Sequence, residues 1–276
     1  MKIEDKQKRE LLMLGVAVLT VLLLLFGRNQ ISGKGDNGTT VVDNKPPQAV
    51  SEPAVAELVT PEPTENPENG VYSYLQGPKS WKERREWSGK WGTEYHDGSS
   101  FGAFGCGFCA MANIYSTLTE YKCTPLDMYA FSKKNTYYGG GGAISWQFMR
   151  KTMAETGFSV RLGEKPSTYE NFCAAAEEAQ AMLVLVSSYN DDSYWKDTPG
   201  HYVTLFLYDK ESQKVFLTDS GDPEHNRHWV RLKTIYKALK TSSDFQYMSI
   251  LGYEKEKDTW RHKTATGTWI EPSGLR

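Results

Sequence analysis

The large apolar side chains of this chain are unevenly distributed, and this limits where a folded core can form. The sequence holds 8 Trp, 16 Tyr and 11 Phe, and all of them except Phe26 follow position 70. A chain offsets the entropy of ordering its backbone only by burying large apolar groups. The sequence therefore predicts one folded domain over residues 71–276, a length typical of a single domain.

An uncharged apolar run, LLMLGVAVLTVLLLLF, lies between Leu11 and Phe26. It is just long enough to cross a bilayer when Arg28 reaches the interface, which predicts a transmembrane anchor over residues 11–27. A cleaved signal peptide has a similar pattern, but no small-residue cleavage site follows Phe26, which favours an uncleaved anchor.

The charges that flank this run predict its orientation. Residues 1–10 contain four basic residues, Lys2, Lys6, Lys8 and Arg9. Positive residues favour the cytoplasmic side, so we expect residues 1–10 in the cytoplasm and everything after the anchor outside it. Arg28 and Lys34 leave the opposite orientation as the alternative.

Residues 28–70 have the composition of a disordered linker. They contain six of the twelve prolines, no aromatic residue, and seven carboxylates against three basic residues. Such a segment cannot collapse, and it would hold the domain away from the membrane. The formal net charge of −2 and the lack of a concentrated basic stretch argue against nucleic acid as a partner.

The folded part changes from helical to strand-like periodicity along its length. Residues 71–105 read mostly as loop. Helices are expected over 106–119, after Ser145, from a Ser167/Glu170 capping box to about residue 180, and over 231–242. Strands are expected over 182–188, 202–209, 214–219 and 246–254. This order predicts an α+β domain with helices packed on an antiparallel sheet.

Cys106 is the sharpest chemical signal in the sequence. It follows the glycine-rich segment FGAFG and is expected to open a helix. The free N–H groups and positive potential of a helix N-terminus favour a thiolate, and they can also stabilise an oxyanion. The sequence thus predicts Cys106 as a nucleophile.

A thiolate nucleophile needs a base, and the base needs an orienting acceptor. His201 begins the strand-like run 202–209, and Asp219 ends the run 214–219. Two antiparallel strands joined by a short turn bring the start of the first beside the end of the second, so the two residues should be neighbours. Asp222 is the alternative orienting residue.

The block GCGFCAMANIYSTLTEYKCTPLDMYA and the later GHYVTLFLYDKESQKVFLTDS resemble the catalytic segments of bacterial papain-like cysteine peptidases, which include the bacteriocin-processing double-glycine leader peptidases. The match spans roughly residues 87–220. The resemblance implies a papain-like fold, with Cys106 as nucleophile, His201 as general base and Asp219 as orienting residue. Peptide, leader peptide, isopeptide and cell-wall cross-bridge all fit as substrates, and the predicted anchor and linker favour a surface or cell-wall peptide. We expect neither a cofactor nor a metal ion.

The resemblance has two departures. Phe108 stands where the family has a proline after Cys-Gly. The family also carries an upstream Gln that donates to the oxyanion, and aligning Trp91-Gly92 places Glu86 there. Gln76 is the nearest upstream Gln, 30 residues before Cys106. Because a carboxylate repels an oxyanion, Glu86 favours an alternative function, a catalytically inactive surface-binding domain.

The remaining cysteines and histidines leave further readings open. Cys109, three residues after Cys106, allows a thiol–disulfide oxidoreductase as a second alternative. A disulfide between Cys123 and Cys173 is compatible with a location outside the cytoplasm. His225 and His228 lack a third metal ligand at a fixed spacing.

Overall fold

The structure is a computed structural model that describes residues 67–76 and 95–263. The predicted cytoplasmic segment 1–10, the anchor 11–27 and the linker as far as residue 66 lie outside these ranges. Within them, no helix is both long and apolar enough to span a bilayer. The last residues of the predicted linker, Pro67–Gly70, form a 3-10 turn, η1, so regular structure begins slightly before residue 71.

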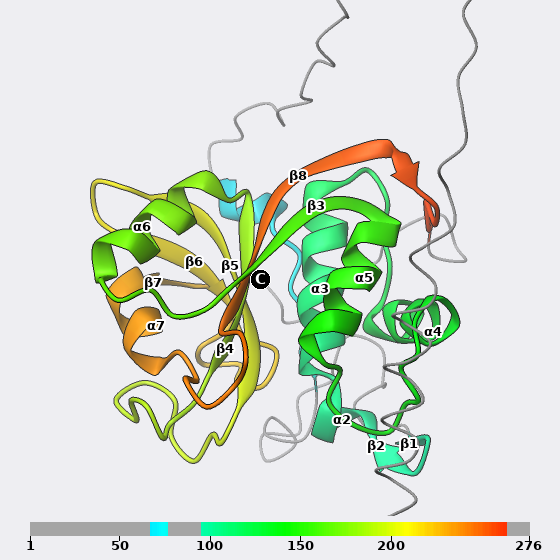
Figure 1. The fold of residues 1–276 in the computed structure, drawn as a ribbon, viewed down its shortest axis with the longest axis horizontal. Coiled ribbons are helices and arrows are strands. Elements are labelled where there is room, and N and C mark those ends of the chain that lie inside the picture. The colour runs from blue at the N-terminus through cyan, green and yellow to red at the C-terminus, as the bar shows by residue number, and fades with distance from the viewer. Residues whose placement is uncertain (1–66, 77–94, 264–276) are drawn as a thin grey trace, which may run out of the picture. The chain divides into compact units, whose positions relative to one another are not determined.

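A six-stranded antiparallel sheet forms the centre of the domain (Figure 1). Its strand order is β3-β8-β4-β5-β6-β7. The strands are β3 (Thr156–Gly163), β4 (Ala181–Val186), β5 (His201–Asp209), β6 (Lys214–Thr218), β7 (His228–Arg231) and β8 (Tyr247–Asp258). A separate two-stranded hairpin is formed by β1 (Tyr95–His96) and β2 (Ser99–Ser100).

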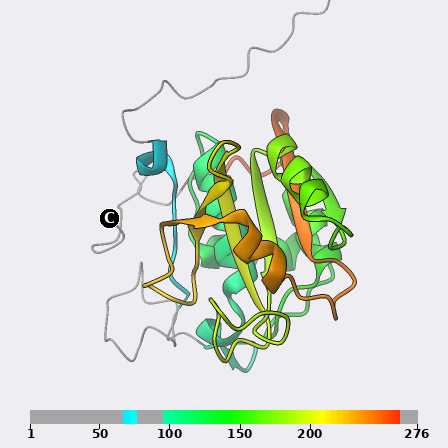
Figure 2. The same cartoon turned by 90° about the vertical axis from the view of Figure 1, so that its left-hand side faces the viewer.

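Helices cover both faces of the central sheet. One side carries α2 (Phe101–Phe104), α3 (Cys106–Leu118), α4 (Pro125–Asn135) and α5 (Trp146–Glu155), and the other carries α6 (Tyr169–Glu178) and α7 (Leu232–Ala238). Figure 2 views the domain from the side of α6 and α7, which lie across the strands in the foreground. The domain is therefore α+β, as the sequence predicted.

Strand β4 shows why two helical layers are needed. All six of its residues are buried. Leu183 packs in the core beneath α3, whereas Val184 belongs to the core beneath α6 and α7. Side chains alternate between the two faces of a strand, so a continuous apolar run such as AMLVLV requires cover on both faces.

Several predicted boundaries hold. Helix α3 begins at Cys106, and Ser145 caps α5 by accepting a hydrogen bond from the backbone N–H of Phe148. The cap of α6 is Thr168, which accepts from the Asn171 N–H; the prediction of Ser167 was wrong by one residue.

Three elements after Cys106 were not predicted from the sequence. Helix α4 begins with a capping box between Thr124 and Asp127. Strand β3 follows α5 directly, and Gly157 lies in β3 with a φ of 85°. Strand β7 is only four residues long, and its position at the sheet edge leaves it few buried residues.

Candidate active site

Cys106 begins the part of α3 that packs closely on the loop before α5. A Cβ atom at Gly107 would lie 2.7 Å from Ile144 Cγ2, so glycine is needed for this approach. The segment FGAFG is helical rather than loop: α2 leads into α3 through Gly105, which has helical dihedrals. Cys106 thus lies one turn into a nearly continuous helical run, and the helix-end potential expected from the sequence is correspondingly weaker.

The β5–β6 hairpin brings His201 beside Asp219, as its antiparallel geometry predicted. Thr204 pairs with Thr218, which places the start of β5 next to the residue that follows β6. His201 Nε2 lies 2.8 Å from Asp219 Oδ1. The alternative, Asp222, instead accepts from the backbone N–H of Glu224 in the following turn.

Cys106 and His201 interact directly and shift each other's pKa. Burial alone would raise the pKa of the Cys106 thiol, but the hydrogen bond and charge of His201, with the backbone N–H groups of Tyr202 and Gly107, lower it overall. Burial alone would lower the pKa of His201, yet Asp219 and Cys106 raise it to about 10. Opposite shifts of this kind favour a thiolate–imidazolium pair. Since Nε2 faces Asp219, Nδ1 is the ring nitrogen left for the sulfur.

Asp219 is fully buried and has donors on both carboxylate oxygens. Oδ1 accepts from the backbone N–H of Gly221 at 2.9 Å as well as from His201. Oδ2 accepts from the indole Nε1 of Trp195 at 2.7 Å. Burial opposes ionisation, but the His201 charge and these donors hold the pKa of Asp219 below its usual value.

An extended segment, Val71–Gln76, runs beside α3 and ends at the site. The Tyr72 N–H donates to Thr117 Oγ1 and the Tyr74 N–H donates to Asn113 Oδ1, both at 2.9 Å. These bonds step along α3 toward its N-terminus and so carry Gln76 to the Cys106 end of the helix.

Gln76 is fixed by bonds to two elements of the site. Its Nε2 donates to the Gly102 carbonyl at 2.6 Å, and its Oε1 accepts from Ser220 Oγ at 3.2 Å. Its backbone N–H donates to the Ser220 carbonyl at 2.6 Å. The amide nitrogen has two N–H groups, so one remains to donate to a ligand beside Cys106.

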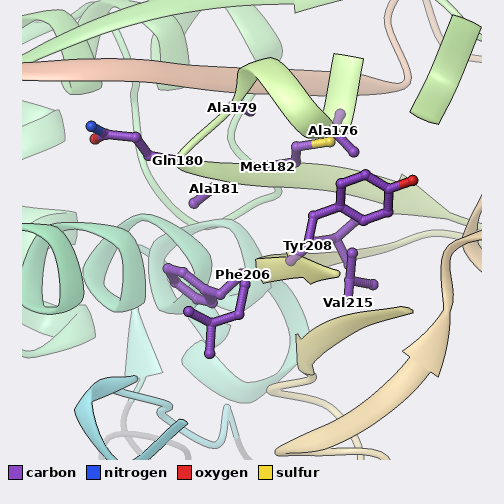
Figure 3. Close-up of a pocket in the computed structure, with 10 residues that line it drawn as sticks. Ala176, Ala179, Gln180, Ala181, Met182, Phe206, Tyr208 and Val215 are labelled. Carbon is purple, nitrogen blue, oxygen red and sulfur yellow. The ribbon is translucent and has the colours of Figure 1, made fainter. Parts of the chain in front are cut away.

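These groups surround a pocket of about 380 Å³. Cys106, His201 and Asp219 line it together with Gln76, and its walls come from α2, the loop 195–200 and the turn 221–225. A second cavity, between α6 and strands β4, β5 and β6 (Figure 3), measures only about 10 Å³, enough for one water molecule at most. Of these two cavities among the described residues, the pocket at Cys106 has room for a substrate.

The other cysteines lie in different surroundings from Cys106. All four belong to the described residues, and all four are free thiols. Burial raises the pKa of both Cys109 and Cys123 well above the ordinary value. Cys123 packs in the core beneath α3 and Cys173 packs against the core beneath α6, so the pairing considered from the sequence is not formed.

Sequence reasoning missed Gln76 and Trp195 as site residues. Gln76 lies 30 residues before Cys106, and the resemblance aligns Glu86 with the family's glutamine instead. Trp195 sits in a polar loop with no periodicity, and no local pattern marks it. Glu86, the residue aligned with the family's glutamine, lies outside the described residues.

The comparisons with protein families and with curated proteins found no match. The function is therefore inferred from the residues of the site.

Proposed function

We propose that the domain is a papain-like cysteine hydrolase, a peptidase or amidase that acts through Cys106, His201 and Asp219. The observation that carries this proposal is the linked set of contacts from thiol to imidazole to buried carboxylate at the wall of one pocket. A nucleophile, a base and an orienting acid in hydrogen-bonding order are what covalent hydrolysis requires.

Acylation begins from the thiolate–imidazolium pair. Cys106 Sγ attacks the carbonyl carbon of the substrate, and the carbonyl electron pair moves to oxygen. Gln76 Nε2 donates a hydrogen bond to that oxyanion. When the oxyanion collapses, the C–N bond breaks and His201 transfers its proton to the leaving nitrogen, which departs as an amine. The product is a thioester on Cys106.

Deacylation uses the same groups in reverse. Neutral His201 accepts a proton from water, and the resulting hydroxide attacks the thioester carbonyl. Collapse of the second oxyanion expels the Cys106 thiolate, releases a carboxylic acid, and restores the ion pair. Asp219 stays ionised throughout and holds the imidazole in the tautomer and orientation that both steps need.

The resemblance and the predicted anchor suggest where this chemistry acts. An anchor at 11–27 and a linker at 28–70 would confine hydrolysis to a shell outside the cytoplasmic membrane. Substrates of that shell include surface peptides and cell-wall peptides. A peptide or cell-wall peptide is accordingly the proposed substrate class.

Two other functions fit fewer observations. The inactive binding domain was favoured by Glu86, but Gln76 supplies the amide donor whose absence motivated it. The oxidoreductase needs a second reactive thiol, whereas Cys109 is fully buried and burial raises its pKa. Neither alternative explains the placement of His201 between Cys106 and Asp219.

Thiol alkylation tests the proposal without knowledge of the substrate. The full-length chain in detergent is treated with iodoacetamide near pH 6, where an ordinary thiol with a pKa of about 8.5 reacts slowly. We expect Cys106 to be alkylated at least about tenfold faster than in a His201→Ala variant. Equal rates in the two proteins would refute the ion pair and with it the proposed function.

Two controls identify the labelled residue and the chemistry. One tryptic peptide, residues 91–122, contains both Cys106 and Cys109, so the label is located by fragmentation and in a Cys109→Ser variant. Wild type should also hydrolyse p-nitrophenyl acetate with a burst of nitrophenol, and Cys106→Ala should show neither burst nor turnover. Turnover that survives in Cys106→Ala would rule out this nucleophile.

A further inference from the structure

The indole of Trp195 is the least expected contact of the triad. Its Nε1 donates to Asp219 Oδ2 at 2.7 Å, and both side chains are buried. Among the described residues, the other cationic group near Oδ2 is His225, whose Nδ1 lies 3.9 Å away, beyond hydrogen-bonding distance. The second carboxylate oxygen thus depends on one donor.

That donor is held in place by a closed loop. Residues 187–200 leave β4 and return to β5, and the loop is closed where the Ser188 N–H donates to the Thr198 carbonyl at 2.8 Å. Ser188 Oγ and the Thr198 N–H add two further bonds across the same gap. The Trp195 ring packs edge-on against Tyr194, with ring centroids 4.7 Å apart.

Two donors on opposite oxygens fix the plane of a carboxylate. The Gly221 N–H holds Oδ1 from the turn after β6, and the Trp195 indole holds Oδ2 from the loop before β5. Without the second donor, Asp219 could rotate about its Cβ–Cγ bond, or draw water toward a buried charge. Either change would weaken its hold on His201.

We propose that Trp195 is a positioning residue of the triad, which orients Asp219 through its indole N–H and thereby keeps His201 aligned with Cys106. This inference rests on the proposed hydrolase function. It assigns the role to the N–H group, and not to the bulk of the ring.

A Trp195→Phe variant removes the N–H and keeps an aromatic ring against Tyr194. We expect the rate of Cys106 alkylation near pH 6 to fall roughly three- to tenfold, and the acid limb of its pH series to move to higher pH, because a less firmly held imidazolium stabilises the thiolate less. Tyr194→Phe is the matched control: it changes a ring in the same cluster that makes no hydrogen bond to Asp219. Its rate should equal that of wild type.

The decisive measurement repeats the substitution with Asn at position 219. In Asp219→Asn, the amide oxygen can keep the bonds to His201 and Gly221. The amide NH₂ then faces the Trp195 N–H, and two hydrogen-bond donors oppose each other. Trp195→Phe should then restore activity or leave it unchanged. A packing role predicts an equal loss in both backgrounds, and that result would overturn the proposal.

A replacement that keeps the shape of the indole serves as a control in case the phenylalanine variant misfolds. Introduction of 3-benzothienylalanine at position 195 by nonsense suppression keeps the bicyclic ring and replaces only the N–H by sulfur. It should reproduce the loss seen with phenylalanine, whereas wild-type rates would refute the inference. If Cys106 of the wild-type protein is alkylated no faster than Cys106 of His201→Ala, the hydrolase proposal fails. If wild type is faster than His201→Ala but the variants at position 195 react as fast as wild type, only the inference about Trp195 fails.

Discussion

Replacing Gln76 by alanine separates the proposed oxyanion hole from the proposed nucleophile. The substitution removes the Nε2 donor and leaves Cys106, His201 and Asp219 in place. It also removes bonds to the Gly102 carbonyl and to Ser220 Oγ. The pocket borders this position, so water can enter and satisfy both groups.

The expected loss of rate differs between two reactions of Cys106, because only one of them forms an oxyanion. Loss of one donor from an oxyanion hole typically slows acyl transfer by about 100- to 1,000-fold, or roughly 3–4 kcal/mol. Alkylation by iodoacetamide is a direct displacement at carbon and forms no oxyanion. We therefore expect the acylation burst with p-nitrophenyl acetate to slow by about two orders of magnitude or more, while the alkylation rate changes by less than about threefold.

Both rates are measured on the same preparation, with unfolding by urea as a check on integrity. A Gln76→Glu variant provides the harsher comparison, because it removes the donor and adds a charge that repels the oxyanion. Its acylation should be at least as slow as that of the alanine variant. Acylation within about tenfold of wild type in Gln76→Ala, or a parallel loss of alkylation, would show that Gln76 does not act on the oxyanion.

Three further predictions follow from the same geometry. Hydrolysis should give a bell-shaped pH profile. Activity is lost as pH falls through the lowered pKa of Cys106, because the nucleophile becomes protonated, and as pH rises through the raised pKa of His201, about 10, because the proton for the leaving group is removed. An acid limb at the ordinary thiol pKa would contradict this. Gly221→Ala places a Cβ 2.9 Å from His201 Cε1, so alkylation of Cys106 should slow by roughly tenfold or more, and an unchanged rate would mean that the ring does not lie there. Cys109→Ser should keep hydrolysis of p-nitrophenyl acetate within about threefold of wild type, since the thiol has no part in the proposed chemistry, whereas a thiol–disulfide exchange function would be abolished.

The parts of the site that the sequence could predict are those set by local geometry. A hairpin joined by a short turn places the first residue of one strand beside the residue that ends the next, so the contact between His201 and Asp219 follows from their spacing alone. Cys106 is marked by its glycines and by the helical period after it. These signals act over a few residues, and each has one simple structural consequence.

The missed parts depend on contacts between distant segments. Gln76 reaches the site because Tyr72 and Tyr74 hydrogen-bond to side chains of α3 about 40 residues away, and no period or motif in VYSYLQ records that pairing. Trp195 comes from a loop whose closure depends on Ser188 and Thr198. Strand β8 inserts between β3 and β4, an order that chain succession does not indicate.

The segment Val71–Gln76 links the two sides of the site. It makes hydrogen bonds to α3 on one side, and on the other Ser73 Oγ donates to Asn226 Oδ1 at 2.5 Å. The same Asn226 oxygen accepts from the backbone N–H of Asp219 at 3.0 Å. One extended segment thus joins the helix that carries the thiol to the turn that carries the carboxylate, and it delivers the amide donor between them. Because the bonds that Tyr72, Ser73 and Tyr74 make to both sides use side chains instead of a regular ladder, a change at Asn226 should disturb Gln76 and Asp219 together, although Asn226 does not line the pocket.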